Sequence, residues 1–296
     1  MTDEAERAAL LHQARRLLER LDAWLPEAPP AIDFATQHAF LWRPQPPFGG
    51  RLLPVARPQP VALDGLLGID RQKATLVRNT RQFLHGLPAN NALLWGARGT
   101  GKSSLVKALL TAFAGNGLRL IEIGKAGLPD LPLVMAALHA RPERFILFCD
   151  DLAFAEGEAG YPQLKAVLEG SVSAPPENVL IYATANRRHL LPEHQAENQD
   201  SRLVGGELHH GDAVEEKISL SERFGLWLAF HPFSQAQYLE MVAAGLADHG
   251  LALDETARAQ ALRYALERGS RSGRVAAQFS RDWIGRQRLY PQGRTD

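Results

Sequence analysis

The sequence predicts an α/β fold in which helices flank a parallel sheet and a small all-helical domain follows. Short, fully apolar runs alternate with segments of helical periodicity between residues 63 and 183. Strands without polar alternation are typical of a parallel sheet that is covered on both faces. After Pro232 the chain contains helical segments only. We therefore expect an α/β domain at residues 63–232 and a helical domain at residues 233–296.

The individual elements follow from periodicity and from capping residues. Apolar runs predict strands at residues 92–95, 118–123, 145–148 and 179–183. Helical spacing predicts helices at residues 71–84, 102–113, 131–139 and 163–169. In the last domain Ser234, Asp254 and Ser272 are the expected N-caps of three helices, which end near residues 248, 268 and 289. Residues 192–216 are polar and aperiodic, which indicates a functional or mobile loop.

The first 62 residues are expected to form a separate N-terminal region. Leu10, Leu17 and Trp24 share the apolar face of a predicted amphipathic helix at residues 4–25. Prolines recur between residues 26 and 60 and exclude long helices there. We interpret this stretch as an irregular lead-in that wraps the next domain or bridges to a partner.

The composition is that of an ordinary globular protein: 45% of the residues are hydrophobic, 22% are charged, and the formal net charge is zero. A neutral chain has no overall attraction for nucleic acid or for anionic lipid. The single cysteine, Cys149, excludes an intramolecular disulfide and a multi-cysteine metal site. The N-terminal segment MTDEAERAAL is acidic and lacks an apolar signal core, and no apolar run reaches the ~18 residues of a membrane span. We expect a cytoplasmic protein with no membrane partner.

The strongest motif is a complete G-x-x-x-x-G-K-[ST] loop between a predicted strand and a predicted helix. Its glycines allow backbone N–H groups to converge on phosphate oxygens, and the helix N-terminus adds partial positive charge. Lys102 is expected to neutralise the β- and γ-phosphates, and Ser103 to ligate Mg²⁺. The predicted phosphate-binding residues are Gly96, Ala97, Arg98, Gly99, Thr100, Gly101, Lys102, Ser103 and Ser104.

A nucleotide-binding loop of this type requires a second strand that ends in a carboxylate for the metal. The strand at residues 145–148 leads through Cys149 to Asp150 and Asp151. Asp150 is expected to hold Mg²⁺ through its water shell, and Asp151 to orient or deprotonate the attacking water. Cys149 is interpreted as a small core residue. The implied cofactors are ATP and Mg²⁺.

The order of these motifs resembles that of AAA+ P-loop ATPases, and within them that of the DnaA-like initiators. By this resemblance Asn186, at the end of the next strand, is the sensor-1 residue that touches the γ-phosphate and the attacking water. Arg223, in the segment Ser-Glu-Arg-Phe, is similar to the arginine finger. Arg274 resembles the sensor-2 arginine of the lid, with Arg271 as the alternative. Because the finger of these ATPases acts on a neighbouring subunit, the resemblance implies a homo-oligomer.

More narrowly, the chain resembles a bacterial ATP-binding family known mainly as a domain of unknown function. The similar segments include LLGID at residues 66–70, the phosphate-binding loop, FCDDL at 148–152, ATANRRHLLP at 183–192 and EEKISLSERFG at 215–225. The family implies the AAA+ fold and no particular substrate. We place the adenine pocket near Leu67, Gly68 and Ile69 and the lid.

Several functions remain open. The leading hypothesis is an oligomeric ATPase motor or switch that acts on a protein or DNA client. Asp151 is one methylene shorter than the glutamate usual in AAA+ enzymes, so a nucleotide-gated binding module or loader with little hydrolysis is the alternative, and Glu156 is a second candidate base. A small-molecule kinase is disfavoured by Asn186 and the Arg-Phe pair. A GTPase is disfavoured because an Asn-Lys-x-Asp motif is missing from the sequence. The arginines of residues 258–294 are either a solvated face or a contact for nucleic acid.

Overall fold

The computed structural model describes residues 2–22, 32–46, 49–154, 160–170, 176–186, 202–204, 207–209 and 220–290. The chain forms two compact units, Met1–Ile32 and Asp33–Asp296. The first unit contains helix α1 (Thr2–Asp22), in which Leu10 and Leu17 are exposed. This helix corresponds to the predicted amphipathic helix, although Trp24 lies outside the described residues.

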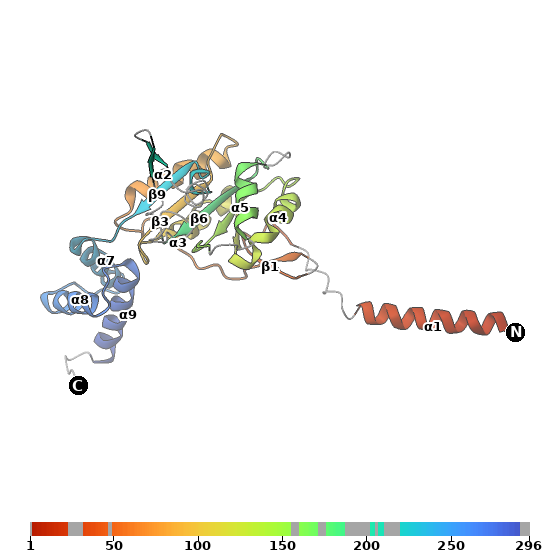
Figure 1. Ribbon diagram of the computed structural model, residues 1–296. Coiled ribbons are helices and arrows are strands. Elements are labelled where there is room, and N and C mark those ends of the chain that lie inside the picture. Colours follow the sequence, from red (N-terminus) through yellow and green to blue (C-terminus); the bar gives the residue numbers. More distant parts are fainter. Residues whose placement is uncertain are drawn as a thin grey trace. The chain divides into compact units, whose positions relative to one another are not determined.

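The second unit is built on a sheet that has seven strands within the described residues (Figure 1). Their order is β2-β1-β4-β5-β6-β3-β9, and every neighbouring pair is parallel except β1 and β2. The strands are β1 (Ala39–Pro44), β2 (Gly50–Pro54), β3 (Ala92–Gly96), β4 (Leu118–Ile123), β5 (Arg144–Cys149), β6 (Val179–Ala185) and β9 (Leu226–Phe230). The predicted α/β class with a parallel sheet is confirmed.

Strands β1 and β2 correct the interpretation of residues 26–60 as irregular. They form an antiparallel pair that extends the sheet beyond β4. The prolines are compatible with this because Pro44 and Pro54 are the last residues of their strands and β2 lies at the sheet edge, where a missing N–H costs no ladder bond. The indole Nε1 of Trp42 in β1 donates a hydrogen bond of 2.9 Å to Asp130. The compact unit therefore begins at Asp33, well before residue 63.

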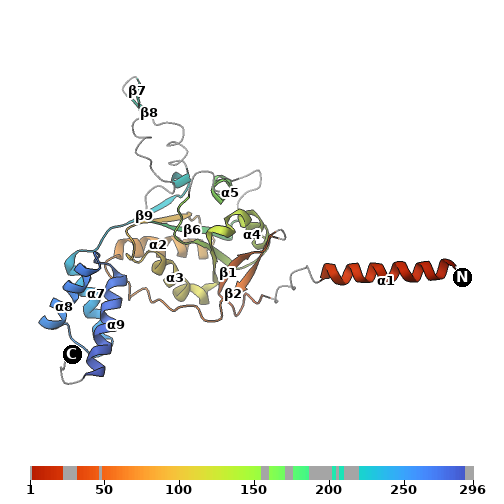
Figure 2. The same ribbon diagram turned by 60° about the horizontal axis from the view of Figure 1, so that its bottom comes forward.

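Helices cover both faces of the sheet (Figure 2). Helices α2 (Asp70–Leu84) and α3 (Lys102–Phe113) pack on one face, where their apolar side chains share a core with alternate residues of the strands. Helices α4 (Leu131–Leu138) and α5 (Gly160–Glu169) lie on the opposite face. Two short 3₁₀ helices, η1 (Ala114–Asn116) and η2 (Lys125–Asp130), flank β4. The sheet is therefore buried on both sides, as its unbroken apolar strands predicted.

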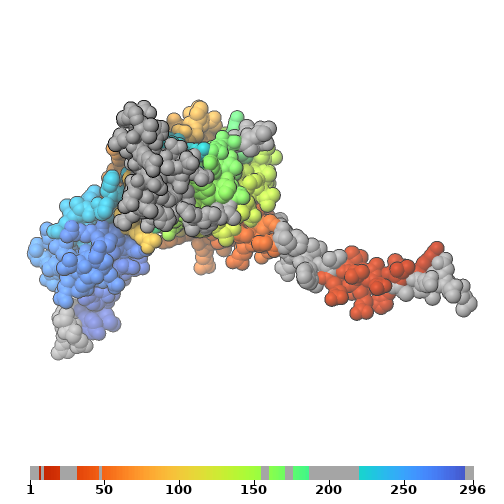
Figure 3. All heavy atoms as spheres, in the orientation of Figure 1, coloured from red at the N-terminus to blue at the C-terminus, as the bar shows by residue number. Residues whose placement is uncertain are grey.

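The C-terminal helices α7 (Gln235–Ala247), α8 (Glu255–Glu267) and α9 (Gly273–Leu289) form a small lid domain. The predicted N-caps are confirmed: the side chains of Ser234, Asp254 and Ser272 each accept a hydrogen bond from the backbone N–H three residues later. The lid has its own core, which includes Tyr238 and Phe279. In the space-filling view of Figure 3 it is a distinct lobe (blue) that joins the rest through the cyan residues of β9 and α7.

Part of the predicted polar loop at residues 192–216 is described. Strands β7 (Arg202–Val204) and β8 (Glu207–His209) pair in antiparallel register there, and the remainder of the loop lies outside the described residues. Among the described helices, none combines the length and the apolar character needed to cross a membrane.

Candidate nucleotide-binding site

The glycine-rich loop connects β3 directly to α3 at the carboxyl edge of the sheet. Gly96 adopts φ 132°, and a Cβ at this position would lie 2.0 Å from the carbonyl oxygen of Phe230, so the close approach of β9 requires glycine. Gly101 precedes the first residue of α3 and adopts φ 95°. The hydroxyl of Thr100 donates to the Ala97 carbonyl at 2.7 Å and closes the loop. The loop is thus folded as an anion-binding cradle at the N-terminus of α3.

Lys102 points back into this loop. Its Nζ donates to the carbonyl oxygens of Gly96 (2.8 Å) and Ala97 (2.7 Å), and only 7% of the residue is exposed. Burial lowers the pKa of Lys102, the charges of Asp151 and Asp150 oppose that shift, and the positive charges of Arg98 and Arg274 add to it. A cation that has lost most of its water and lies near other cations is stabilised by a polyanionic ligand.

Ser103 and Asp150 meet although 47 residues separate them in sequence. The Ser103 hydroxyl donates to Asp150 Oδ1 at 2.6 Å, because the first turn of α3 faces the end of β5. A hydroxyl and a carboxylate are the hard oxygen donors that Mg²⁺ prefers, and Mg²⁺ retains several waters beside them. The donor set at the end of β5 therefore fits a magnesium ion with a nucleotide phosphate as a further ligand.

Asp151 and Asn186 also lie together at the sheet edge. The Asn186 amide donates a short hydrogen bond to Asp151 Oδ1. Among the described residues other than glycine, Asp151 is the one with positive φ, at 52°. Backbone strain of this kind gathers at functional sites, where surrounding contacts maintain it. Glu156, the second candidate for the base, lies outside the described residues.

Thr184 is a site residue that the sequence interpretation missed. Its hydroxyl donates to Asp150 Oδ1 at 2.6 Å and accepts the Asp151 N–H at 2.8 Å. Thr184 is 1% exposed. The signal in the sequence was a polar residue inside an apolar strand, two residues before Asn186. A buried hydroxyl requires hydrogen-bonding partners, and in a strand that ends at the loop these partners belong to the site.

The lid contacts the loop through the start of α9. The N–H of Gly273 donates to the Gly99 carbonyl at 2.9 Å, and a Cβ on Gly99 would lie 3.5 Å from the Cβ of Arg274. Arg274 is exposed, and its charge is close enough to lower the pKa of Lys102. The structure therefore places Arg274 beside the glycine-rich loop.

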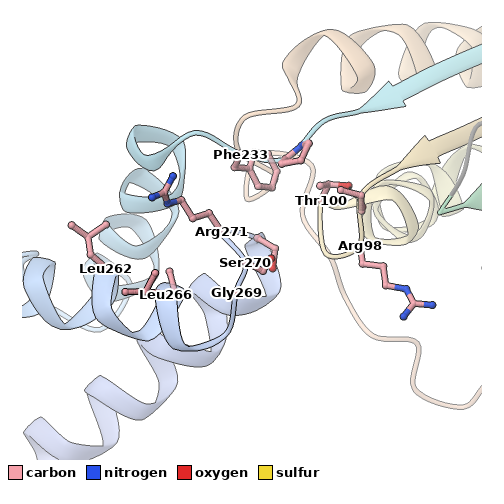
Figure 4. Close-up of a pocket in the computed structure, with 12 residues that line it drawn as sticks. Arg98, Thr100, Phe233, Leu262, Leu266, Gly269, Ser270 and Arg271 are labelled. Carbon is pink, nitrogen blue, oxygen red and sulfur yellow. Dashed lines mark hydrogen bonds between the residues drawn. The ribbon is translucent and has the colours of Figure 1, made fainter.

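A cavity of about 540 Å³ lies between part of the loop and the lid (Figure 4). Phe233 and Arg271 line it together with Leu262 and Leu266 of α8. This volume lies within the usual range of about 300–1,000 Å³ for small-molecule sites. In Figure 4 the side chain of Arg98 points away from the lid helices. The cavity combines apolar walls with adjacent loop residues, as a base-binding pocket requires.

The predicted adenine residues lie behind the wall of this cavity. A Cβ on Gly68 would contact the ring of Phe233 at 3.1 Å, and Ile69 is buried with its Cδ1 3.4 Å from the corresponding position on Gly101. Leu67 is half-buried beside them. Leu67, Gly68 and Ile69 are not among the residues that line the cavity, and Gly68 lies against Phe233, which does line it. Phe233 follows Pro232 at the junction of the two domains, where a sequence pattern gives little indication of a pocket.

Arg223 has a partner outside the phosphate loop. It forms an ion pair with Glu169, the last residue of α5, and its side chain is 25% exposed. Lys102, by contrast, donates hydrogen bonds to the loop carbonyls, and Asp151 accepts one from Asn186. Within one chain, the ion pair therefore directs Arg223 toward α5.

The chain matches a known protein family. A model of the family described as "Protein of unknown function (DUF815)" matches residues 35–287. None of the curated proteins matches the chain in sequence.

Solved structures give the fold. The Thermotoga maritima RuvB Holliday junction branch migration motor is 16% identical, with a TM-score of 0.53 over 80% of this chain and 68% of that chain. The Aeropyrum pernix Orc1 protein in complex with DNA is 14% identical, with a TM-score of 0.52 over 78% of this chain and 62% of that chain. At such identities the likeness shows the fold alone, which is that of AAA+ P-loop proteins. Because the family model extends from before β1 into helix α9 of the lid, the chain belongs to the DUF815 family, and its fold is that of AAA+ P-loop proteins.

Proposed function

We propose that this protein is a magnesium-dependent ATPase whose nucleotide cycle acts on a macromolecular partner. The observation that carries the proposal is the chain of hydrogen bonds from Ser103 through Asp150 and Thr184 to Asp151 and Asn186. Of these residues, Ser103 and Asp150 are enough to hold a metal ion beside a bound phosphate. The additional carboxylate and amide at the strand ends are the groups that water activation requires.

Each residue has a specific task in this proposal. Lys102 leaves the carbonyls of Gly96 and Ala97 to bind the β- and γ-phosphates, and the N–H groups of the loop bind the same oxygens. Ser103 and Asp150 hold Mg²⁺, which when bound neutralises charge that develops on the phosphates. Asp151 accepts a proton from the attacking water, and Asn186 orients that water and the carboxylate.

The adenine is assigned to the cavity between the loop and the lid. Phe233 offers an aromatic face, Leu262 and Leu266 offer apolar contacts, and Arg271 adds a polar group to the lining. Gly68 lies against Phe233, and Ile69 lies against Gly101 of the loop, so both support the walls of this cavity. A base held here joins the two domains, so that nucleotide binding fixes the position of the lid.

Assembly into a homo-oligomer is part of the proposal. In the single chain Arg223 is paired with Glu169 at the end of α5. An arginine that exchanges this carboxylate for the γ-phosphate of a neighbouring subunit supplies its charge only in the assembled protein. The client, a protein or DNA, is then any macromolecule whose binding depends on the state of the oligomer.

A second candidate is a nucleotide-gated binding module that hydrolyses little ATP. The observation that favours it is the short side chain of Asp151, whose Oδ1 is already bonded to Asn186. A carboxylate with less reach and one occupied oxygen is a weaker base for water. The two functions differ in turnover, and both require the same nucleotide site.

The test is phosphate release by the purified protein with ATP, with and without Mg²⁺. We expect turnover that requires Mg²⁺ and is lost, together with ATP affinity, in Lys102→Ala. Lys107→Ala, on the same helix and outside the loop, is the matched control and keeps both. Tight ATP binding without phosphate release would favour the binding module. Transfer of phosphate to a small molecule would favour a kinase, and equal competition by GTP would contradict the adenine assignment.

A further inference from the structure

We propose that the Thr184 hydroxyl is a positioning group that holds Asp150 and Asp151 together, so that metal binding and water activation depend on one side chain. The inference rests on the proposed function for its catalytic consequence. Its structural basis stands on the contacts of Thr184 alone. This threonine is the second-last residue of the apolar strand β6 and is almost completely buried.

The direction of each hydrogen bond can be assigned. An ionised carboxylate only accepts hydrogen bonds, so the single hydroxyl proton of Thr184 goes to Asp150 Oδ1 at 2.6 Å. The hydroxyl oxygen then accepts the N–H of Asp151 at 2.8 Å. The backbone carbonyl of Thr184 accepts the N–H of Leu152 at 2.7 Å. One residue thus contacts three consecutive residues of the loop that follows β5.

These contacts hold a conformation that Asp151 does not favour by itself. Its φ of 52° lies in the left-handed region, which costs a non-glycine residue free energy unless neighbouring groups compensate. The bond from the Asp151 N–H to Thr184 fixes the peptide at this turn. The fixed backbone then directs the Asp151 carboxylate to Asn186.

The same hydroxyl also decides how Asp150 presents its carboxylate. The hydrogen bonds that Asp150 accepts from Ser103 and from Thr184 both end on Oδ1. With Oδ1 held from two sides, the carboxylate has little rotational freedom when it meets the water shell of the metal. Without the threonine hydroxyl, Ser103 would be the remaining side chain among the described residues that donates to Asp150, and Ser103 is itself a predicted metal ligand.

A replacement that keeps the shape and removes the hydroxyl tests this arrangement. Thr184→Val is expected to reduce the single-turnover rate of ATP hydrolysis by about tenfold to a hundredfold, because small displacements of reacting groups have effects of this size. It should also reduce the factor by which Mg²⁺ increases ATP affinity, while affinity for ATP in EDTA is unchanged because the loop keeps its contacts. Thr184→Ser restores the hydroxyl and should recover both properties.

Thr80→Val is the matched control. Thr80 is also buried, and its hydroxyl contacts the Leu76 carbonyl and the hydroxyl of Tyr182 in the same strand β6, away from the site. Loss of a buried hydroxyl there should lower thermal stability without altering the effect of Mg²⁺. If the hydroxyl of Thr184 contributed only to stability, the two valine variants would behave alike, and the proposal would be overturned.

A double-mutant comparison separates positioning from general damage. If Thr184 acts on water activation through Asp151, Thr184→Val has little further effect on single-turnover hydrolysis at saturating Mg²⁺ and ATP once Asp151 is changed to Asn, since the group that it positions is already disabled. Independent, multiplicative losses would contradict the inference, as would a Thr184→Ser variant as impaired as Thr184→Val. If the wild-type protein releases no phosphate, the proposed ATPase function fails, and the Mg²⁺ effect on ATP affinity in Thr184→Val and Thr184→Ser still decides the positioning role.

Discussion

The metal side and the arginine side of the candidate site differ in how completely one chain builds them. On the metal side, Asp150 Oδ1 accepts hydrogen bonds of 2.6 Å from Ser103 and Thr184, and Asp151 and Asn186 continue the network. On the arginine side, Arg274 belongs to the lid and Arg223 is paired with Glu169. The metal side joins neighbouring strands of a rigid sheet, whereas the arginines come from the lid and from the segment before β9.

This difference suggests a division of labour. Groups fixed by a sheet are ready before the nucleotide arrives, because their alignment is achieved during folding. Groups on a separate lid or on another subunit become available only when the domains or subunits come together. The groups fixed by the sheet are therefore expected to determine whether hydrolysis is possible. The arginines of the lid and of the neighbouring subunit are expected to determine whether hydrolysis occurs in a given state of assembly.

The largest effect on the arginine side is expected from Arg223. Arg223→Ala should bind ATP normally and lose hydrolysis by about 10³-fold, the lower end of the effects known for arginine fingers. Mixing Arg223→Ala with Lys102→Ala should restore part of the activity, since the first supplies an intact loop and the second an intact finger. Phosphate release from exchanged subunits measures this. Mixing Lys102→Ala with Asp151→Asn is the control, because a finger in trans cannot repair a site that lacks either residue.

The metal side is tested by Asp151→Asn. This change keeps the size of the side chain and removes the charge that accepts a proton, so single-turnover hydrolysis should fall by about 10²-fold. Affinity for ATP, measured by titration calorimetry, should stay close to that of the wild type. Unchanged turnover would assign the base to another group such as Glu156.

The two arginines of the lid are expected to have smaller effects, which differ in whether hydrolysis or ATP binding changes. Arg274 lies near enough to Lys102 to influence its pKa, and Arg271 lines the cavity. If Arg274 contacts the phosphates as proposed, Arg274→Ala should reduce hydrolysis by about tenfold, equivalent to one charge-assisted hydrogen bond. Arg271→Ala should instead weaken ATP binding with little change in the single-turnover rate at saturation. Measured rates and dissociation constants in the reverse order would exchange the two assignments.

The smallest effect is expected from removing residues 1–30. Helix α1 belongs to a compact unit that is separate from the unit with the nucleotide site. ATP affinity and the thermal transition of the truncated protein should therefore match those of the full chain. A collapsed transition would make the first unit part of the folded body.

Much of the fold was predictable because local pattern and tertiary burial agree. The apolar runs of β3, β4, β5 and β6 are buried on both faces of the sheet. Capping residues such as Ser234 mark the starts of helices because their side chains bond to a backbone N–H only three residues later in the sequence. The errors arose where local signals conflict with tertiary context. Prolines concealed β1 and β2, although they lie at strand ends, and β9 is a five-residue run whose pairing with β3 is visible only in the sheet.

Some residues of the candidate site could be predicted from the sequence, and others could not. The phosphate-binding loop is contiguous, so its residues could be named from the pattern alone. Thr184 acquires its meaning only when β6 lies beside β5 and its hydroxyl reaches the two aspartates. The cavity wall at Phe233 likewise depends on how the lid is placed against the loop. The assignments of catalytic and adenine-binding residues stay predictions until they are measured.

The backbone hydrogen bond from Gly273 to Gly99 has a thermodynamic consequence for the lid. It connects the first turn of α9 to the middle of the loop to which we assign the phosphates, so a shift of either segment by about an ångström weakens a bond of this length. Phosphate occupancy and lid orientation are therefore linked variables. By reciprocity, a client that prefers one lid orientation changes nucleotide affinity by the same factor by which nucleotide changes the affinity for that client. A titration of either ligand in the presence of the other reads out this coupling without any hydrolysis.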